Sequence, residues 1–390
     1  MSFPCYVCKQ ETASSHHFYP KLCPACGELN FEKRMSTADL NGYTALVSGG
    51  RLKIGFETAL RLLRCGARVV ITTRFEDDAR RRFSRQADYV VWKDRLQIYA
   101  ADFRSPAFVE DLVQWLCDGV GVLDILINNA AQTVRRPPAF YRHLIAHHDE
   151  ARTIQTGGGK YLLQLHEREG GTHGATPGHR LTTADVRRDP KAVAELSQLT
   201  LMPGDKVYDD NIFPQGRVDE DGQQEDRRDF NSWIMKLEDI HLVEFLEVMY
   251  VNVITPFMLC SRLKKIMKKK ESERPSFIVN VTAMEGNFYD PEKNCRHPHT
   301  NMAKAALNMM TRTSASDFRK DRIFMNSVDP GWITNEKPFP LEASHSMQKT
   351  KIALDQVDGA SRVCDPIFRA LNENEYFSGL LFKNYMVYPW

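Results

Sequence analysis

The sequence predicts an α/β fold: a doubly wound parallel sheet with a small cysteine-bearing unit at its N-terminus. Short runs rich in Val, Ile and Leu alternate with amphipathic helical segments from about residue 42 onward. A glycine-rich turn joins the first such run to the first helix, and two Cys-x-x-Cys pairs precede this region. The chain has 390 residues, 42% of them hydrophobic, which is enough for one large α/β domain with additions or for two domains.

Composition excludes several broad classes of protein. The net charge is +2, so charge alone indicates neither a nucleic-acid nor a membrane partner. There is no run of about 18 apolar residues, so no transmembrane helix is expected. The start, "MSFPCYVCKQ", lacks a basic stretch followed by an apolar core and does not resemble a secretory signal. Nine cysteines, four of them in matched pairs, suit a reducing compartment, so we expect a cytoplasmic protein.

The N-terminal segment, residues 1–38, carries a metal-binding pattern. Fourteen residues separate the two Cys-x-x-Cys pairs, and each pair can grip one tetrahedral ion from one side. Two matched pairs this close together argue against redox disulfides. A closed shell of four thiolates predicts a structural zinc ion, which would also fold a segment too short to bury much core. The unit is either a folded cap on the main domain or a surface that binds a protein partner. The predicted ligands are Cys5, Cys8, Cys23 and Cys26.

The first half of the main domain alternates strands and helices. The run "TALVS" predicts a first strand, followed by the glycine turn and the helix "IGFETALRLLRCGA". "RVVITTR" and "LQIYAADF" predict the next two strands, with a polar helix between them, and "FVEDLVQWLCDGV" predicts a helix before the fourth strand, "LDILINNAA". Strands and helices at this spacing favour right-handed βαβ units, and so a parallel sheet with helices on both faces.

A long insertion follows the fourth strand, at about residues 135–228. It is polar and rich in Gly, Pro, Asp, Arg and His, as in "REGGTHGATPGHR". This composition predicts a few short helices with flexible parts between them. We expect proteases to cut first within 157–222 and the sheet not to need that stretch. The insertion is a second candidate surface for a protein partner.

The alternation resumes after the insertion. A long helix is predicted at "DIHLVEFLEVMYVNVITPFMLCSRLKKIMKKK", followed by the fifth strand, "SFIVNV". "NMAKAALNMMTRTSASDF" predicts a helix, "IFMNSVDPGW" the sixth strand and "GLLFKNYMV" the last strand. The α/β domain is therefore expected to span 42–390, interrupted by the insertion.

Residues 42–390, apart from the insertion, resemble the short-chain dehydrogenase/reductases. "SGGRLKIG" stands where that family has T-G-x-x-x-G-x-G, and "NNAA" matches its N-N-A-G. "VNV" in the long helix, "VNVTAMEG" after the fifth strand, "AKAAL" and "DPGW" match later landmarks in the family's order. The resemblance implies a Rossmann-type domain that binds a dinucleotide, with the pyrophosphate at a helix N-terminus.

The resemblance also implies which residues contact the dinucleotide. Lys53 stands at the family's middle glycine, where a side chain either crowds the pyrophosphate or pairs with it. Arg74 follows the second strand, where no Asp or Glu could hold a free 2′-hydroxyl, so NADP(H) is favoured over NAD(H). Arg51 adds charge nearby, and Asp102 matches an adenine-contacting aspartate. The implied cofactor-binding residues are Ser48, Gly49, Arg51, Lys53, Ile54, Gly55, Arg74, Asp102, Asn129, Ala130, Lys304, Pro330 and Gly331.

The catalytic residues implied by the resemblance are only partly present. The family uses Asn, Ser, Tyr and Lys; here Asn252 and Lys304 keep two of these positions. Ala283 stands at the serine position and Thr300 at the tyrosine position, so the two groups that touch the substrate oxygen are missing. A threonine hydroxyl is a far weaker acid than a phenol with a pKa of about 10.

A second Tyr-x-x-x-Lys leaves two functions open. Tyr289 and Lys293 have the family's spacing, but Pro291 between them predicts a loop rather than a helix. Tyr289 is nevertheless the candidate replacement acid, ahead of His299, Cys295 and Thr282. One hypothesis is a non-catalytic NADP(H)-binding scaffold or nucleotide-sensing subunit. The alternative is an NADP(H)-dependent oxidoreductase of a carbonyl or alcohol with a non-standard proton donor. The resemblance also allows a homo-oligomer.

Overall fold

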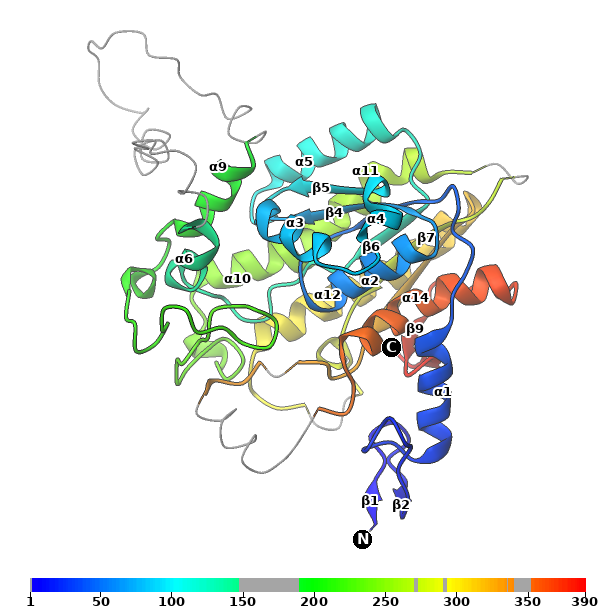
Figure 1. The fold of residues 1–390 in the computed structure, drawn as a ribbon, viewed down its shortest axis with the longest axis horizontal. Helices are drawn as coiled ribbons and strands as arrows, with labels where there is room; N and C mark the ends of the chain where they lie inside the picture. Colours follow the sequence, from blue (N-terminus) through cyan, green and yellow to red (C-terminus); the bar gives the residue numbers. More distant parts are fainter. Residues whose placement is uncertain (1, 147–188, 270–272, 290–292, 335, 340–351) are drawn as a thin grey trace.

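The computed structural model describes residues 2–146, 189–269, 273–289, 293–334, 336–339 and 352–390 (Figure 1). Its centre is an eight-stranded sheet flanked by helices on both faces, with strand order β10-β9-β8-β7-β6-β3-β4-β5. The strands are β3 (Thr44–Val47), β4 (Arg68–Thr73), β5 (Leu96–Ala100), β6 (Ile125–Asn128), β7 (Ser276–Val281), β8 (Ile323–Asp329), β9 (Leu381–Lys383) and β10 (Met386–Tyr388).

The strand order reverses beside β3. The chain runs outward from β3 through β4 to β5, then returns to place β6, β7 and β8 on the other side of β3. All of these pairs are parallel. The predicted doubly wound, Rossmann-type fold is confirmed. In such a sheet, ligands bind in the crevice beyond the carboxyl ends of the strands at the reversal, here between β3 and β6.

The end of the chain differs from the prediction. "GLLFKNYMV" forms two short strands, because β10 turns back and pairs antiparallel with β9. The two residues between them, Asn384 and Tyr385, have φ of 50° and 66°. Positive φ at both central positions is what a two-residue hairpin turn requires. The pair lacks the glycine that usually marks such a turn, which is why the sequence read as one strand.

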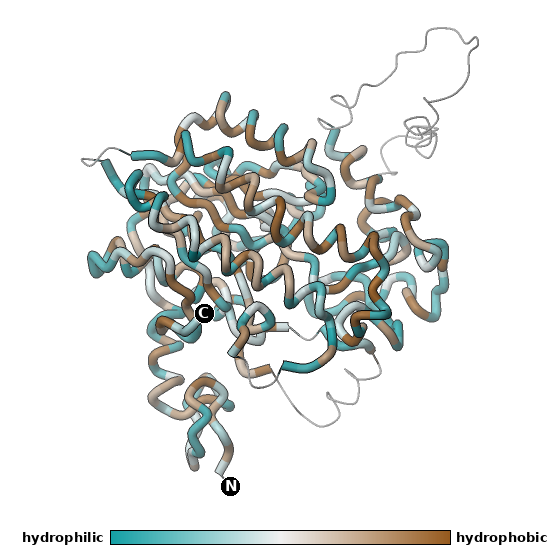
Figure 2. Tube along the Cα trace, turned by 180° about the vertical axis from the view of Figure 1, so that it is seen from behind, coloured by the Kyte–Doolittle hydropathy of each residue, from teal (hydrophilic) through white to brown (hydrophobic). Residues whose placement is uncertain are grey.

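Two apolar cores lie on the two faces of the sheet. On one face, α2 (Lys53–Arg64), α3 (Glu76–Ser84) and α14 (Gln356–Asn372) bury their apolar sides. On the other, α5 (Pro106–Trp115), α11 (Thr255–Met267) and α12 (Pro298–Lys320) do so. Seen from behind, apolar residues concentrate in the centre of the body and polar ones at its edges (Figure 2). Shorter helical elements are α4 (Tyr89–Trp92), η1 (Lys93–Arg95), η2 (Leu116–Val120), η4 (Leu196–Gln198), η6 (Leu237–Asp239) and η8 (Met284–Gly286).

The long central helix has a bulge. It runs as α10 (Leu242–Met249), a π-helical turn η7 (Tyr250–Ile254) and then α11. Pro256 lies just after the wide turn. Proline has no backbone N–H to donate to the preceding turn, and this favours an irregular turn at that point of the helix. The sequence predicts no membrane-spanning segment, but Leu242–Met267 is long and apolar enough by length and composition to cross a membrane. Core helices of soluble proteins share this length and composition, and 39% of the most apolar stretch of this helix is buried.

The N-terminal unit and the insertion flank the sheet. The unit comprises a hairpin of β1 (Phe3–Pro4) and β2 (Glu11–Thr12), and then α1 (Pro24–Met35), which packs on α14. The described parts of the insertion include α6 (Pro138–Ala146), α9 (Pro190–Glu195) and η5 (Pro203–Lys206). Their apolar residues form a third cluster with Phe75. Of the stretch expected to be cut by proteases, 157–188 lies outside the described residues, and the rest contains buried side chains such as Val193 and Asp205.

Candidate nucleotide and metal sites

A cleft of about 420 Å³ opens at the carboxyl ends of β3, β4, β5 and β6. It lies where the strand order reverses, as the fold predicts. Most of the residues implied as nucleotide contacts line it, and so do residues of the insertion. The first group is Gly49, Arg51, Lys53, Ile54, Gly55, Arg74, Asp102, Asn129, Ala130 and Lys304. The second group includes Arg136, Phe140, Tyr141, Asp219 and Gln223.

The glycine turn after β3 is tied to the end of β6. The Ser48 hydroxyl accepts hydrogen bonds from the backbone N–H groups of Asn129 (2.9 Å) and Ala130 (3.0 Å). Gly49 has φ of +69°, and a Cβ there would lie 2.9 Å from the Ala130 Cα. A Cβ on Gly55 would lie 2.2 Å from the Gly49 carbonyl oxygen. Both glycines are therefore required by close packing, as in a dinucleotide-binding turn.

Lys53 departs from the glycine pattern in conformation and in charge. Its φ of +53° lies in the left-handed region that favours glycine. Its ammonium lies 3.4 Å from a Glu336 oxygen and 3.8 Å from an Asp221 oxygen. Burial lowers the pKa of Lys53, but Glu336, Asp221 and Asp219 raise it more, so the net pKa is raised and the group is charged. Acidic side chains thus lie beside the expected pyrophosphate position.

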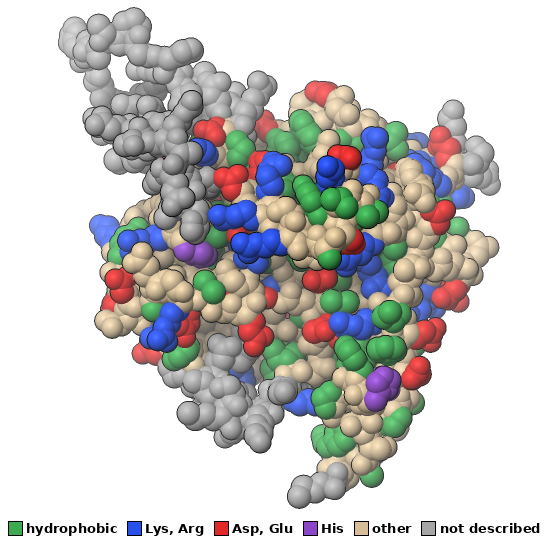
Figure 3. Space-filling view, viewed as in Figure 1, with side chains coloured by type: hydrophobic (Ala, Val, Ile, Leu, Met, Phe, Trp, Pro, Cys, Tyr) green, Lys and Arg blue, Asp and Glu red, His purple; other side chains and the backbone are tan. Residues whose placement is uncertain are grey.

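Arg74 lies at the end of β4 beneath the insertion. Its guanidinium donates to the Tyr141 hydroxyl (2.9 Å) and stacks over that ring, 4.6 Å from the centroid. Among the described residues, no carboxylate forms an ion pair with it. Arg51 instead pairs with Asp78 (2.6 Å) and donates to Gln223 (2.8 Å), and burial lowers its pKa to about 10. Basic side chains gather over the middle of the face seen in Figure 3.

Asp102 is already held by a neighbour. Arg104 grips its carboxylate, with the closest contact at 2.6 Å, and also donates to the Leu196 carbonyl (3.1 Å). Burial raises the pKa of Asp102, but Arg104 and then Arg74 lower it, and the net pKa lies below its usual value. Asp102 is therefore an anion at neutral pH, and the Arg104 guanidinium occupies its oxygens.

Of the four catalytic positions implied by the resemblance, Lys304 lines the cleft, and Asn252, Ala283 and Thr300 do not. Lys304 donates to the Val281 carbonyl (2.9 Å) and has its pKa lowered to about 8 by burial. Thr300, one turn earlier on α12, is buried, and its hydroxyl has no hydrogen-bond partner among the described residues. Asn252, in the π turn, accepts from the Gln132 N–H (2.7 Å) and donates to the Gln132 carbonyl (3.2 Å). Ala283 follows β7 and carries no hydroxyl.

None of the candidate replacement acids is among the residues that line the cleft. Tyr289 is 74% exposed and does not line the cleft. Lys293 donates to the Glu285 carbonyl (2.7 Å), and residues 290–292 lie outside the described part of the chain. Cys295 is exposed. His299 is buried on α12, with its Nε2 3.5 Å from a Glu244 oxygen. The Thr282 hydroxyl is buried without a described partner.

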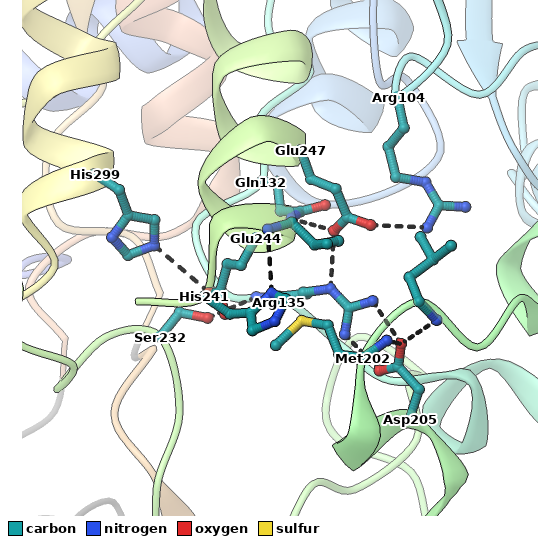
Figure 4. A network of polar contacts seen from close by, with 12 residues as sticks. Arg104, Gln132, Arg135, Met202, Asp205, Ser232, His241, Glu244, Glu247 and His299 are labelled. Atoms are coloured by element: carbon teal, nitrogen blue, oxygen red, sulfur yellow. Dashed lines mark hydrogen bonds and ion pairs between the residues drawn. The ribbon is translucent and has the colours of Figure 1, made fainter. Parts of the chain in front are cut away.

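A buried charge network that no sequence pattern predicts fixes the insertion (Figure 4). Arg135 pairs with Asp205 (2.5 Å) and with Glu247 of α10 (3.0 Å). Glu247 also lies 3.4 Å from Arg104, which holds Asp102, so the network runs from the insertion to the cleft. Arg135 and Asp205 are ordinary charged residues in a polar stretch and Glu247 lies in an apolar helix, so only the fold brings them together.

The four N-terminal cysteines form one cluster. Their sulfur atoms all lie within 4.8 Å of one another, and the Cys8 and Cys23 sulfurs are 3.9 Å apart. Four thiolates at about 2.3 Å from a tetrahedral zinc ion lie about 3.8 Å apart. The Cys23 N–H also donates to the Cys5 sulfur (3.3 Å), as backbone groups commonly do to thiolates in such knuckles. The donor set and its spacing therefore fit a closed structural zinc site.

Comparison with known proteins identifies the family. A model described as short chain dehydrogenase matches residues 43–147, and one described as enoyl-(acyl carrier protein) reductase matches residues 231–356. An uncharacterized protein of Acanthamoeba polyphaga mimivirus is 30% identical over 376 residues, covering 94% of this chain and 71% of that protein. The 3-oxoacyl-[acyl-carrier-protein] reductase of a Synechocystis strain is 28% identical over 30% of this chain and 43% of its own length.

Solved structures of low identity share the fold. A short chain dehydrogenase from Burkholderia cenocepacia in complex with NADP has a TM-score of 0.53 at 18% identity, covering 88% of this chain and 96% of that one. The Pseudomonas aeruginosa RhlG/NADP complex has a TM-score of 0.52 at 19% identity, covering 88% and 95%. Together with the matching family models and the glycine turn, these likenesses show that the chain belongs to the short-chain dehydrogenase/reductase family.

Proposed function

We propose that the protein binds NADP(H) in the cleft at the strand reversal. The observation that carries this proposal is Arg74, a guanidinium at the end of β4 that forms no ion pair with a carboxylate among the described residues, although its charge acts on Asp102. A 2′-phosphate is the natural anion for a guanidinium in that place. The first turn of α2 supports it, because its N-cap, Leu52, offers no side-chain cap to the free N–H groups. The NADP complexes among the similar structures agree with this assignment.

Titration with NADPH, followed by its fluorescence, tests the proposal. The wild-type protein should bind NADPH more tightly than NADH, and Arg74→Ala should remove most of that preference. Arg142→Ala is the matched control, because Arg142 is exposed on α6 and does not line the cleft. Equal affinity for the two nucleotides, unchanged by Arg74→Ala, would show that the 2′-phosphate is not read there.

We infer further that the protein lacks ordinary reductase chemistry and acts as a nucleotide-binding scaffold or sensing subunit. Bound NADPH would supply a hydride; the chain must supply the proton. Ala283 offers no donor to a developing oxyanion, and Thr300 offers only a weakly acidic hydroxyl. Lys304 and Asn252 are the two catalytic positions that are retained, and neither of them replaces the phenol that the family has at the position of Thr300. With this supply of protons missing, nucleotide binding is the function that remains.

A working oxidoreductase is the second candidate. The buried hydroxyls of Thr282 and Thr300 and the buried His299 beside Glu244 are polar groups that a core does not need, and they favour it. Consumption of NADPH with a panel of aldehydes and ketones decides between the two. Robust turnover that Tyr289→Phe or His299→Gln abolishes would overturn the scaffold function and name the acid. No turnover with a protein that binds NADPH supports the scaffold.

We also propose a structural zinc ion in residues 1–38, with 42–390 as the α/β domain. Metal analysis of the purified protein should give one zinc ion per chain, bound by the four clustered sulfurs. Cys8→Ser combined with Cys23→Ser should abolish it. Protein that carries no zinc, or retains it in the double variant, would refute the site. A reduced four-cysteine site is consistent with a cytoplasmic location, which fractionation of cells would test.

A further inference from the structure

The four-cysteine unit contacts the turn that follows β8. The Tyr6 hydroxyl, between the first two cysteines, accepts a hydrogen bond from the Trp332 N–H (2.8 Å). Gly331 has φ of +88°, and a Cβ there would lie 3.5 Å from the Tyr6 oxygen and 2.9 Å from Leu354. The positive φ favours glycine at this bend. The Tyr6 oxygen lies in van der Waals range of it, so the unit packs directly against the turn.

An apolar cluster joins the same unit to the cleft. Its buried members from the unit are Cys5, Tyr19 and Leu22, and its buried members from the α/β domain are Ile333, Ala353 and Leu354. Ile54 packs against this cluster and also lines the cleft beside Lys53. Three of the four cysteines, Cys5, Cys23 and Cys26, thus belong to the same packed cluster as Ile54.

Polar contacts hold the unit at a second point. The Tyr19 hydroxyl donates to Asp358 (2.5 Å), and Arg34 of α1 pairs with the same carboxylate (2.9 Å). Asp358 is buried in the first turn of α14, where it also accepts from the Asp355 N–H (3.0 Å). The unit is therefore fixed between the start of α14 and the turn after β8.

We propose that the four-cysteine unit holds the 331–334 turn in place at the cleft, so that metal binding and nucleotide binding favour each other. Thr334, at the end of this turn, and Glu336, just beyond it, line the cleft, and Glu336 lies 3.4 Å from the Lys53 ammonium. A unit of this length cannot bury a core of its own, so its order depends on the metal. Loss of the metal frees Tyr6, and the turn then loses its hydrogen-bond acceptor and its apolar support. The proposal rests on NADP(H) binding in the cleft for its nucleotide half.

The coupling has a magnitude and a direction. Couplings between sites in one protein are typically about 5- to 150-fold in affinity, and they are reciprocal. Removal of the metal with a chelator, or by Cys8→Ser combined with Cys23→Ser, should weaken NADPH binding about five- to tenfold. Saturating NADPH should slow the transfer of zinc to a coloured chelator to a similar degree. The eight-stranded sheet should remain folded, as circular dichroism would show.

Tyr6→Phe separates the contact from the metal. This variant keeps the ring, the cysteines and the metal, and loses only the acceptor of the Trp332 N–H. It should bind zinc normally and show faster hydrogen exchange at 331–334 and two- to fivefold weaker NADPH binding, on the order expected for one lost hydrogen bond. Tyr208→Phe is the control, because Tyr208 is 50% exposed in the insertion and away from the cleft. That variant should match the wild type in both measurements.

Two results would overturn the coupling. One is zinc-depleted protein with the exchange pattern of the zinc-loaded form at 331–334. The other is unchanged NADPH affinity after zinc loss in a protein that does bind NADPH. If zinc-loaded wild-type protein binds no NADPH at all, the proposed nucleotide function fails, and hydrogen exchange at the turn still decides whether the unit holds it.

Discussion

At the scale of single residues, Lys53 combines a strained backbone conformation with an ammonium that lies near two carboxylates. A left-handed φ costs a non-glycine residue about 1 kcal/mol or more, so we expect interactions of the Lys53 side chain to offset this cost. Its ammonium lies between Glu336 and Asp221, which would otherwise face the phosphates of a bound nucleotide. We therefore attribute to Lys53 the neutralisation of these carboxylates rather than an obstruction of the site.

Replacing Lys53 tests this role. Lys53→Gly relieves the backbone but leaves the two carboxylates without their cation, so NADPH binding should weaken several-fold. Adding Glu336→Gln to that variant should restore part of the affinity, because it removes the repulsion. Fluorescence titration at two salt concentrations measures both, since repulsion between exposed charges is screened by salt. Tighter binding by Lys53→Gly alone would show that the side chain obstructs the pyrophosphate.

Lys304 predicts a pH dependence of binding. Burial lowers its pKa to about 8, so it loses its proton as the pH rises through that value. An anionic dinucleotide favours the charged form, so the Kd for NADPH should rise about tenfold between about pH 7 and about pH 9. Lys304→Met should bind weakly and with a flat profile across that range. A wild-type Kd that is constant with pH would mean that the ammonium does not interact with the ligand.

The same lowered pKa makes a separate contribution to folding. Above about pH 8 the folded protein has released this proton, while the unfolded chain keeps it up to about pH 10. The unfolded state therefore binds more protons in that window, and the Lys304 contribution to stability increases with pH across it. Comparison with Lys304→Met isolates this term from other titrating groups.

At the scale of elements, Arg135 clamps the insertion to the domain. Asp205 and Glu247 are both buried, and Arg135 is their common partner. Arg135→Ala would leave two buried carboxylates without this cation, which typically costs about 3–5 kcal/mol. We expect a loss of about 3 kcal/mol in the free energy of unfolding, measured by urea denaturation.

Arg142→Ala serves as the control for Arg135→Ala, because Arg142 is an exposed arginine whose guanidinium lies 5.5 Å from the Tyr208 ring. It should change stability by less than about 1 kcal/mol. If Arg135→Ala is as mild as this control, the network does not fix the described part of the insertion. A variant with a shortened insertion that lacks the network would then be expected to keep the sheet folded.

The elements that the sequence predicted well are those whose environment is uniform. A strand buried on both faces, such as β7, reads as a mostly apolar run, and all six of its residues are buried. The glycine turn is equally easy to predict, because the close packing at Gly49 and Gly55 leaves no room for a Cβ. The insertion is different: Arg135 and Asp205 are 70 residues apart, and nothing local distinguishes them from solvated charges. The partners of Lys53 and Arg74 come from such distant segments too, so the chemistry of the cleft depends on packing that spacing alone does not reveal.

At the scale of the whole molecule, one apolar surface remains exposed. Leu242, Leu246 and Phe257 lie at near-helical spacing along α10 and α11, and are 66%, 45% and 58% exposed. Met302 and Met309 of the adjacent α12 are 51% and 56% exposed. Contiguous apolar side chains on neighbouring helices usually mark an interaction surface. This surface also explains why the helix is apolar enough to resemble a membrane span while part of it is buried in the core.

We predict that two copies of the chain associate through this surface, because an apolar face is satisfied by an identical one related by twofold symmetry. Light scattering during gel filtration should give about twice the 44.7 kDa chain mass. Leu246→Glu combined with Met309→Glu should yield a monomer that still binds NADPH, since neither residue lines the cleft. Val90→Glu is the matched control, because Val90 is an equally apolar residue, 73% exposed, on α4. A monomeric wild type, or a dimer that the paired substitution leaves intact, would show that this face does not bind a second copy; recovery of the wild type on lipid vesicles would then assign it to a membrane.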